Sequence, residues 1–106
     1  MTMITFAQGN IRFTPRVAGV AIEDGRVLLH QAESDGFWAL PGGRAELLES
    51  AADTLRREMR EELDIEVEVV RPLWLGENFF QHQGCQHHEL GIYFLMRVPV
   101  DWSHRA

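Results

Sequence analysis

Residues 43–65 of the chain read GRAELLESAADTLRREMREELDI, and no other run of the sequence is as informative. Its apolar residues recur at steps of three and four, which is the spacing of one face of an α-helix. These apolar positions are Ala51, Ala52, Leu55, Met59 and Leu63. The run therefore predicts an amphipathic helix of about four turns over Glu49 to Leu63.

The polar side of this predicted helix carries three carboxylates. Glu58, Glu61 and Glu62 span about 100° of the helix circumference, next to the apolar stripe. Like charges at this spacing cost about 0.2–0.5 kcal/mol per pair, so a positive partner is expected. A hard divalent cation is one such partner, because Mg²⁺ prefers oxygen ligands. Neighbouring arginines on a solvated, salt-bridged helix face are the other, and for a Glu- and Arg-rich helix taken alone they are the simpler explanation.

The whole run resembles the Nudix box, the signature motif of a hydrolase family. That motif is Gly, five residues, Glu, seven residues, Arg-Glu, an aliphatic residue, one residue, Glu-Glu, one residue, Gly and an aliphatic residue. Eight of its nine defined positions match, and residues 38–42 (WALPG) also resemble the family's approach to the box. The departure is Asp64, which stands where the family usually has Gly. Since Asp tolerates the left-handed region better than most residues, we expect a small stability cost there.

The resemblance implies a site and an activity. Glu58, Glu61 and Glu62 would bind Mg²⁺ or Mn²⁺, and Glu58 or Glu61 would also position or deprotonate the attacking water. Arg57 would orient Glu58 or another carboxylate of the box, while Glu49 would support the loop and helix. The metal would neutralise the diphosphate and lower the pKa of bound water.

The implied reaction is Mg²⁺-dependent hydrolysis of the diphosphate bond in a nucleoside diphosphate linked to another group. The alternative is a Nudix-like nucleotide-binding or regulatory module that keeps the fold without turnover. Damage to the Arg-Glu-x-x-Glu-Glu core would favour that alternative, and here the core, residues 57–62, is intact.

Strand-like segments flank the predicted helix. Arg16 to Gln31 predicts a hairpin around Asp24-Gly25, and a short strand at Gly36 to Leu40 runs into Pro41-Gly42-Gly43, which predicts a loop. After the helix, alternating apolar residues predict strands at Ile65 to Val70, Leu73 to Phe80 and His87 to Val98, with a turn near Gly84. The fold class is therefore α/β, and the resemblance implies a Nudix-type α/β/α sandwich with a mixed sheet.

The chain predicts one domain over residues 1–106, and the sequence stops soon after its last strand. A sheet with one covering helix would leave an apolar face in water. We therefore expect a C-terminally incomplete domain that lacks its last helix, or a partner chain, such as a second copy in a homodimer, over that face.

The amino-acid composition excludes several classes of binding partner. The net charge of −6 argues against nucleic acid as a main partner, and the absence of Lys excludes phosphate binding through a P-loop lysine. No apolar run is long enough to span a membrane and the N-terminus lacks a leader pattern, so we expect a cytoplasmic protein without a membrane partner. Cys85 is the only cysteine, which leaves no disulfide within the chain.

Two residues outside the box are candidates for substrate contact. They are Trp38, whose ring could stack on a nucleobase, and Glu89, which shares a strand face with Tyr93. Aromatic residues at strand positions are more often part of a core, and the simpler alternative for Glu89 is a solvated strand carboxylate. Markers of ADP-ribose and dinucleoside polyphosphate cleavage are missing, since Gln81 and His82 occupy that region. The nucleoside diphosphate derivative is therefore not specified.

Overall fold

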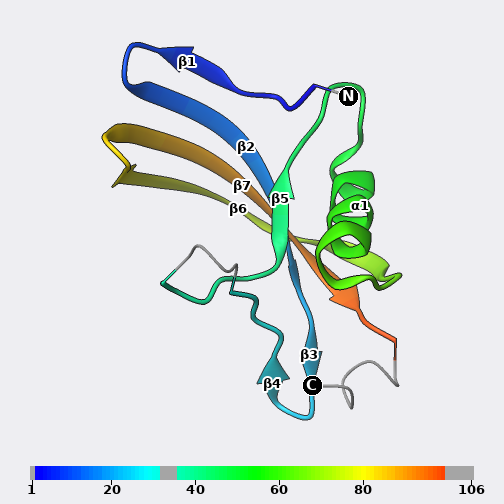
Figure 1. Ribbon diagram of the computed structural model, residues 1–106. Coiled ribbons are helices and arrows are strands. Elements are labelled where there is room, and N and C mark those ends of the chain that lie inside the picture. The colour runs from blue at the N-terminus through cyan, green and yellow to red at the C-terminus, as the bar shows by residue number, and fades with distance from the viewer. Residues whose placement is uncertain (1, 32–35, 100–106) are drawn as a thin grey trace.

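The chain folds into a mixed, curved sheet with one helix packed against it (Figure 1). The structure is a computed structural model, and it describes residues 2–31 and 36–99. The elements in chain order are β1 (Phe6–Gln8), β2 (Ile11–Val20), β3 (Ile22–Glu23), β4 (Arg26–Val27), β5 (Gly42–Arg44), α1 (Ala51–Leu63), β6 (Glu68–His82) and β7 (Cys85–Arg97).

The sheet has the strand order β1-β2-β7-β6, and β5 pairs with β2 beside this path. β2 and β7 run parallel, with Val17 opposite Ile92, while the other pairs are antiparallel. A parallel pair needs a long crossover connection, and the segment between β2 and β7 contains α1. The predicted α/β class with a mixed sheet is confirmed.

The core lies between α1 and the sheet. Leu55 and Met59 of the helix are fully buried, and they pack in one cluster with Val17 of β2 and with Phe94 and Met96 of β7. Burial of a large apolar side chain contributes about 1.5–3 kcal/mol, so this stripe fixes which side of α1 meets the sheet. The charged side of the helix is left at the surface.

Both ends of α1 are capped. Ser50 Oγ accepts a hydrogen bond from the Asp53 N–H at 3.1 Å, so the helix begins at Ala51 rather than at the predicted Glu49. Asp64 has φ 55° and ψ 44°, and its N–H donates to the Arg60 carbonyl at 3.2 Å. The left-handed conformation expected at Asp64 is confirmed.

Two tight turns follow the predicted pattern. Asp24 and Gly25 have φ of 51° and 74° between β3 and β4, and Gln83 and Gly84 have φ of 50° and 77° between β6 and β7. Two consecutive positive φ values match the right-handed twist of the flanking strands. The short β3–β4 hairpin forms its own two-stranded sheet.

The strand predicted at Gly36–Leu40 is wrong. The structure has only one isolated bridge there, between His30 and Ala39, and the strand forms later, as β5. The reason is close packing: a Cβ at Gly42 would overlap the Val17 carbonyl of β2. The glycines thus allow β5 to pair closely with β2 instead of ending a strand.

The outer strands also differ from the prediction. The pattern of apolar residues did not predict β1 or the first half of β2, which pair with each other at the sheet edge. Ile65–Val70 and Leu73–Phe80 were predicted as two strands, but β6 runs as one, with register shifts at Val69/Arg71 and Pro72/Trp74. Such irregularities keep Pro72, which cannot donate a ladder hydrogen bond, within a continuous strand.

Several large apolar side chains on the outer strands are exposed, among them Phe6 (66%), Leu75 (68%) and Phe79 (70%). The prediction about the segment after the last strand concerns residues 101–106, which lie outside the described residues. Within the described ranges, no helix is long and apolar enough to cross a membrane.

Candidate active site

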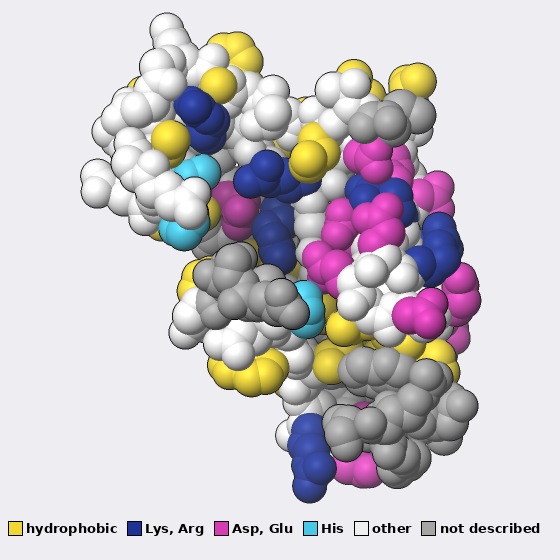
Figure 2. Space-filling model, viewed as in Figure 1, with side chains coloured by type: hydrophobic (Ala, Val, Ile, Leu, Met, Phe, Trp, Pro, Cys, Tyr) yellow, Lys and Arg dark blue, Asp and Glu magenta, His cyan; other side chains and the backbone are white. Residues whose placement is uncertain are grey.

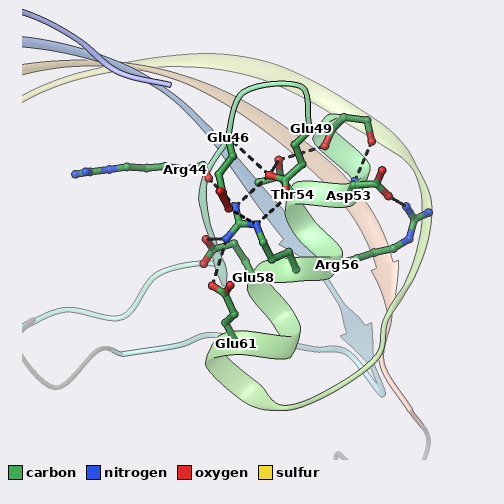
Figure 3. Close-up of polar contacts among 10 residues, drawn as sticks. Arg44, Glu46, Glu49, Asp53, Thr54, Arg56, Glu58 and Glu61 are labelled. Carbon is green, nitrogen blue, oxygen red and sulfur yellow. Dashed lines mark hydrogen bonds and ion pairs between the residues drawn. The ribbon is translucent and has the colours of Figure 1, made fainter. Parts of the chain in front are cut away.

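Arg57 contacts four carboxylates at α1 and in the loop before it, and Figure 3 shows the carboxylates of Glu46, Glu49, Glu58 and Glu61 gathered together. Its Nε is 2.8 Å from Glu49 Oε2 and 2.8 Å from Glu46 Oε1, and its Nη1 donates to Glu58 Oε1 at 2.8 Å and to Glu61 Oε2 at 3.2 Å. The Arg57 side chain is only 20% exposed. One guanidinium therefore fixes carboxylates from the loop before the helix and from the helix itself.

Glu49 is held by further contacts. Its Oε1 accepts hydrogen bonds from Thr54 Oγ1 at 2.7 Å and from Arg57 Nη2 at 3.1 Å. The Arg57 hydrogen bond, more than any other contact, lowers the pKa of Glu49 to about 2. These contacts agree with the supporting role expected for Glu49, because they connect the loop to the first turns of α1.

Glu58 packs against the backbone of β5. A Cβ at Gly43 would overlap the Glu58 carboxylate, so any other residue there would displace the carboxylate from this position. The Glu58 side chain is 14% exposed. The first glycine of the box therefore brings a carboxylate of the helix onto the edge of the sheet.

Glu62 lies beside Glu58. Burial, followed by the hydrogen bond and negative charge of Glu58, raises the pKa of Glu62 to about 7, although the positive charge of Arg16 opposes this shift. His30 Nδ1 is 3.5 Å from Glu62 Oε2. Two carboxyl groups so close together require either a shared proton or a cation, since like charges at this distance oppose ionisation.

The structure places Glu58, Glu61 and Glu62 on one side of α1, and their assignment as metal ligands stays a prediction. Arg57 links Glu58 with Glu61, and Glu62 is adjacent to Glu58. Within the described residues, no three Asp, Glu, His or Cys side chains are already grouped as a metal-ligand set. The donor chemistry still suits a hard divalent cation, because all three groups present carboxylate oxygens.

Four residues of the site were not predicted: Arg16, His30, Arg44 and, as an Arg57 partner, Glu46. Arg16 and Arg44 are opposite each other on β2 and β5. Neither guanidinium has a hydrogen bond or ion pair within the described part of the chain. Figure 2 shows acidic side chains gathered over α1 and basic ones beside them. This pairing of Arg16 with Arg44 has no local sequence signal, because it depends on the position of β5.

The two further candidates, Trp38 and Glu89, are not joined to the carboxylates by any contact within the described residues. Trp38 is 63% exposed, next to Ala39, which bridges to His30. Glu89 is half-buried on β7, opposite Asn78 of β6. Their roles in substrate binding remain predictions.

Two shallow hollows lie at the far end of the sheet. One of about 340 Å³ is lined by Asn10 and residues 81–86, and one of about 450 Å³ is lined by Ile11, residues 79–81 and residues 86–88. None of the box carboxylates lines either hollow. We place the candidate site at α1, because charge and donor chemistry, rather than enclosure, select a site for a cation and phosphates.

A comparison with family models shows the family to which the chain belongs. A model described as the NUDIX domain matches residues 13–105. The chain belongs to the Nudix family. This Nudix chain is similar to a CTP pyrophosphohydrolase of Escherichia coli (strain K12), with 44% identity over 71 residues, which cover 63% of this chain and 48% of that protein. A MutT-like protein of Streptomyces ambofaciens is 48% identical over 54 residues, which cover 50% of this chain and 35% of that protein.

The similarity of the chain to solved structures agrees with this family assignment. The crystal structure of a UDP-X diphosphatase has a TM-score of 0.68 and 28% identity, covering 81% of this chain and 42% of that one. A MutT Nudix hydrolase from Burkholderia pseudomallei has a TM-score of 0.69 and 28% identity, covering 80% and 67%. The Nudix resemblance and fold class predicted from the sequence are confirmed. The chain spans less than half the length of the two curated relatives.

Proposed function

We propose that this Nudix chain hydrolyses a diphosphate bond in a nucleoside diphosphate derivative, with Mg²⁺ held by Glu58, Glu61 and Glu62. The observation that carries the proposal is the close pair of Glu58 and Glu62, set against Gly43 at the edge of the sheet. An ordinary solvated helix face would spread its carboxylates apart. Here Glu58 packs against the backbone of β5, and Glu62 lies next to Glu58.

The arginines supply the charge that a diphosphate needs. Arg16 and Arg44 are adjacent across β2 and β5, and Arg16 is close enough to Glu62 to influence its pKa. Arg57, in contrast, is already paired with four carboxylates. We assign Arg16 and Arg44 to the phosphates and Arg57 to positioning Glu58 and Glu61.

The reaction adds one water to the anhydride. The water oxygen forms a bond to one phosphorus, the bond from that phosphorus to the bridging oxygen breaks, and the bridging oxygen leaves on the second phosphate. The proton lost by the water is accepted by a carboxylate, for which Glu58 and Glu61 are the candidates. When bound, the metal would neutralise the diphosphate and lower the pKa of the attacking water.

Glu58 and Glu61 differ in their surroundings. Glu58 is 14% exposed and Glu61 is 59% exposed, although both contact Arg57 Nη1. A carboxylate that is fixed by backbone and by an ion pair suits metal binding, whereas one that is open to solvent can pass a proton to water. We therefore favour Glu61 as the proton acceptor.

The relatives guide the choice of substrates. The similarity to a CTP pyrophosphohydrolase makes nucleoside triphosphates the first group to test, and the similarity to a UDP-X diphosphatase makes UDP-linked compounds the second. ADP-ribose and dinucleoside polyphosphates complete the panel. Product analysis of each reaction identifies the bond that is cut.

The test measures phosphate or nucleotide release with and without Mg²⁺ for the wild type, Glu62→Gln and Glu68→Gln. Glu68 is on β6 with its carboxylate 3.2 Å from Arg97 and is 63% exposed, so it controls for the loss of a surface carboxylate. We expect Glu62→Gln to reduce turnover at least about a hundredfold and Glu68→Gln to leave it unchanged.

Equal losses in the two variants would show that general surface charge, not a metal site, supports activity. Nucleotide binding without hydrolysis of any compound in the panel would instead assign the chain to the catalytically silent Nudix-like modules. Glu46→Gln is unsuitable as a control, because Glu46 Oε1 is 2.8 Å from Arg57 Nε.

A further inference from the structure

The strand register places two arginines and two glycines in a single row across the sheet. Arg44 of β5 is opposite Arg16 of β2, Arg16 is opposite Gly91 of β7, and Gly91 is opposite Gly76 of β6. Residues opposite each other on neighbouring strands share a face of the sheet. The row therefore runs from the two arginines on β5 and β2 to two positions without side chains on β7 and β6.

An aromatic ring lies over this bare part. A Cβ at Gly91 would be 2.7 Å from Tyr93 Cε2 and 2.8 Å from the Tyr93 hydroxyl oxygen, so any other residue there would displace the ring from this position. A Cβ at Gly76 would be 3.6 Å from the same ring. Asn78 Nδ2 donates to the Tyr93 hydroxyl at 3.3 Å. Gly91 and Asn78 together hold the ring of Tyr93 towards the arginine row.

Trp74 extends this aromatic surface. Its ring stacks on Tyr93 with centroids 4.9 Å apart and an interplanar angle of 20°, and Trp74 is 50% exposed. The half-buried ring of Tyr93 thus orients a tryptophan that still offers aromatic surface to a ligand. Stacking on such a surface accepts any nucleobase, because every base has a π-face.

We propose that the Trp74–Tyr93 pair binds the nucleobase of the substrate while Arg16 and Arg44 bind its phosphates. This inference rests on the proposed function. Trp74 lies on β6, two strands away from Arg16 and two residues along β6 from Gly76, which is in the row of Arg16. At ordinary strand spacing and rise this corresponds to a Cα separation of about 12 Å. An extended nucleoside diphosphate separates its base from its terminal phosphate by a comparable length.

The same two strands carry a matched control. Phe80 of β6 stacks on His87 of β7 with centroids 4.9 Å apart and an interplanar angle of 5°, and Phe80 is 43% exposed. This pair lies on the same sheet face, but six residues further along β6. The arginine in its row, Arg12, donates instead to the carbonyls of Gly9 and Ile11.

The experiment compares two probes by calorimetry: nucleoside monophosphates, which carry a base, and inorganic pyrophosphate, which does not. The variants are Trp74→Leu, which keeps apolar bulk but removes the ring, Trp74→Phe, which keeps a ring, and Phe80→Leu. We expect Trp74→Leu to weaken nucleoside monophosphate binding about tenfold or more and to leave pyrophosphate binding unchanged. Trp74→Phe should bind both probes nearly as the wild type does, and Phe80→Leu should do the same.

Equal monophosphate affinity in Trp74→Leu and wild type would overturn the inference. So would a matching loss of pyrophosphate affinity, or an equal effect of Phe80→Leu, because either would point to general destabilisation. Failure of the proposed function has a different signature, namely no hydrolysis of any diphosphate while the affinities follow the expected pattern.

Discussion

Replacing Arg57 by Gln tests whether one guanidinium holds the carboxylates around α1 together. In the folded protein Arg57 is the main cause of the low pKa of Glu49, which falls from its usual 4.5 to about 2. Each pKa unit corresponds to about 1.4 kcal/mol, so the upper limit for this pair is about 3 kcal/mol. Glu49 is 16% exposed and Arg57 20% exposed, and solvent screening reduces the contribution to about 1–2 kcal/mol.

Loss of the contacts with Glu46 and Glu58 adds to this cost, because their carboxylates would be left close together without a cation. We expect Arg57→Gln to lower the free energy of unfolding by about 2–3 kcal/mol at pH 7, below the 3–5 kcal/mol that is typical of fully buried pairs. Urea denaturation followed by circular dichroism measures this. Arg56→Gln is the matched control, since the Arg56–Asp53 pair is 40% and 64% exposed and is expected to contribute less than about 1 kcal/mol.

The difference in stability between wild type and Arg57→Gln is expected to depend on pH. Because the folded state lowers the pKa of Glu49, its stabilising effect is complete above the unfolded value of 4.5 and is lost as the pH falls towards 2. The difference between wild type and Arg57→Gln should therefore be largest above about pH 5 and shrink below pH 4. A loss no larger than that of Arg56→Gln, or a difference that stays constant down to pH 3, would refute the reasoning.

Two further variants probe the backbone around the site. Gly43→Ala should reduce Mg²⁺-dependent hydrolysis at least about tenfold, because the new Cβ would displace the Glu58 carboxylate; steady-state kcat measures this, and unchanged kcat would show that the Glu58 position is unimportant. Asp64→Gly should raise the free energy of unfolding by about 0.5–1 kcal/mol, because φ at Asp64 is 55°, where glycine is unstrained. Denaturation of this variant to a lower stability would contradict the account of the helix end.

The local features of the site were predictable from sequence. The helix and its three carboxylates follow from spacing and residue chemistry within one short run, and the left-handed residue at position 64 follows from the resemblance to the Nudix box. The turns at Asp24-Gly25 and Gly84 are equally local, because a pair of positive φ values requires particular residues. Each of these features depends on neighbours in the chain rather than on distant strands.

The features that were missed depend on long-range pairing. Gly42 and Gly43 suggested a loop, yet the space they leave lets β5 pair with β2 and brings Arg44 next to Arg16. The parallel register of β2 and β7, which aligns Arg16 with Gly91, has no local sequence signal either. Contacts between side chains of separate strands therefore could not be predicted from the periodicity within one segment.

The metal site is the central claim, and binding of Mn²⁺, measured by electron paramagnetic resonance with Mg²⁺ as competitor, tests it most directly because it needs no substrate. We predict saturable Mn²⁺ binding that Mg²⁺ displaces and that Glu62→Gln weakens at least about tenfold, since even groups that only orient metal ligands contribute that much. Glu68→Gln should bind Mn²⁺ as the wild type does. Equal Mn²⁺ affinity in wild type and Glu62→Gln would contradict the assignment of the α1 carboxylates to a divalent cation.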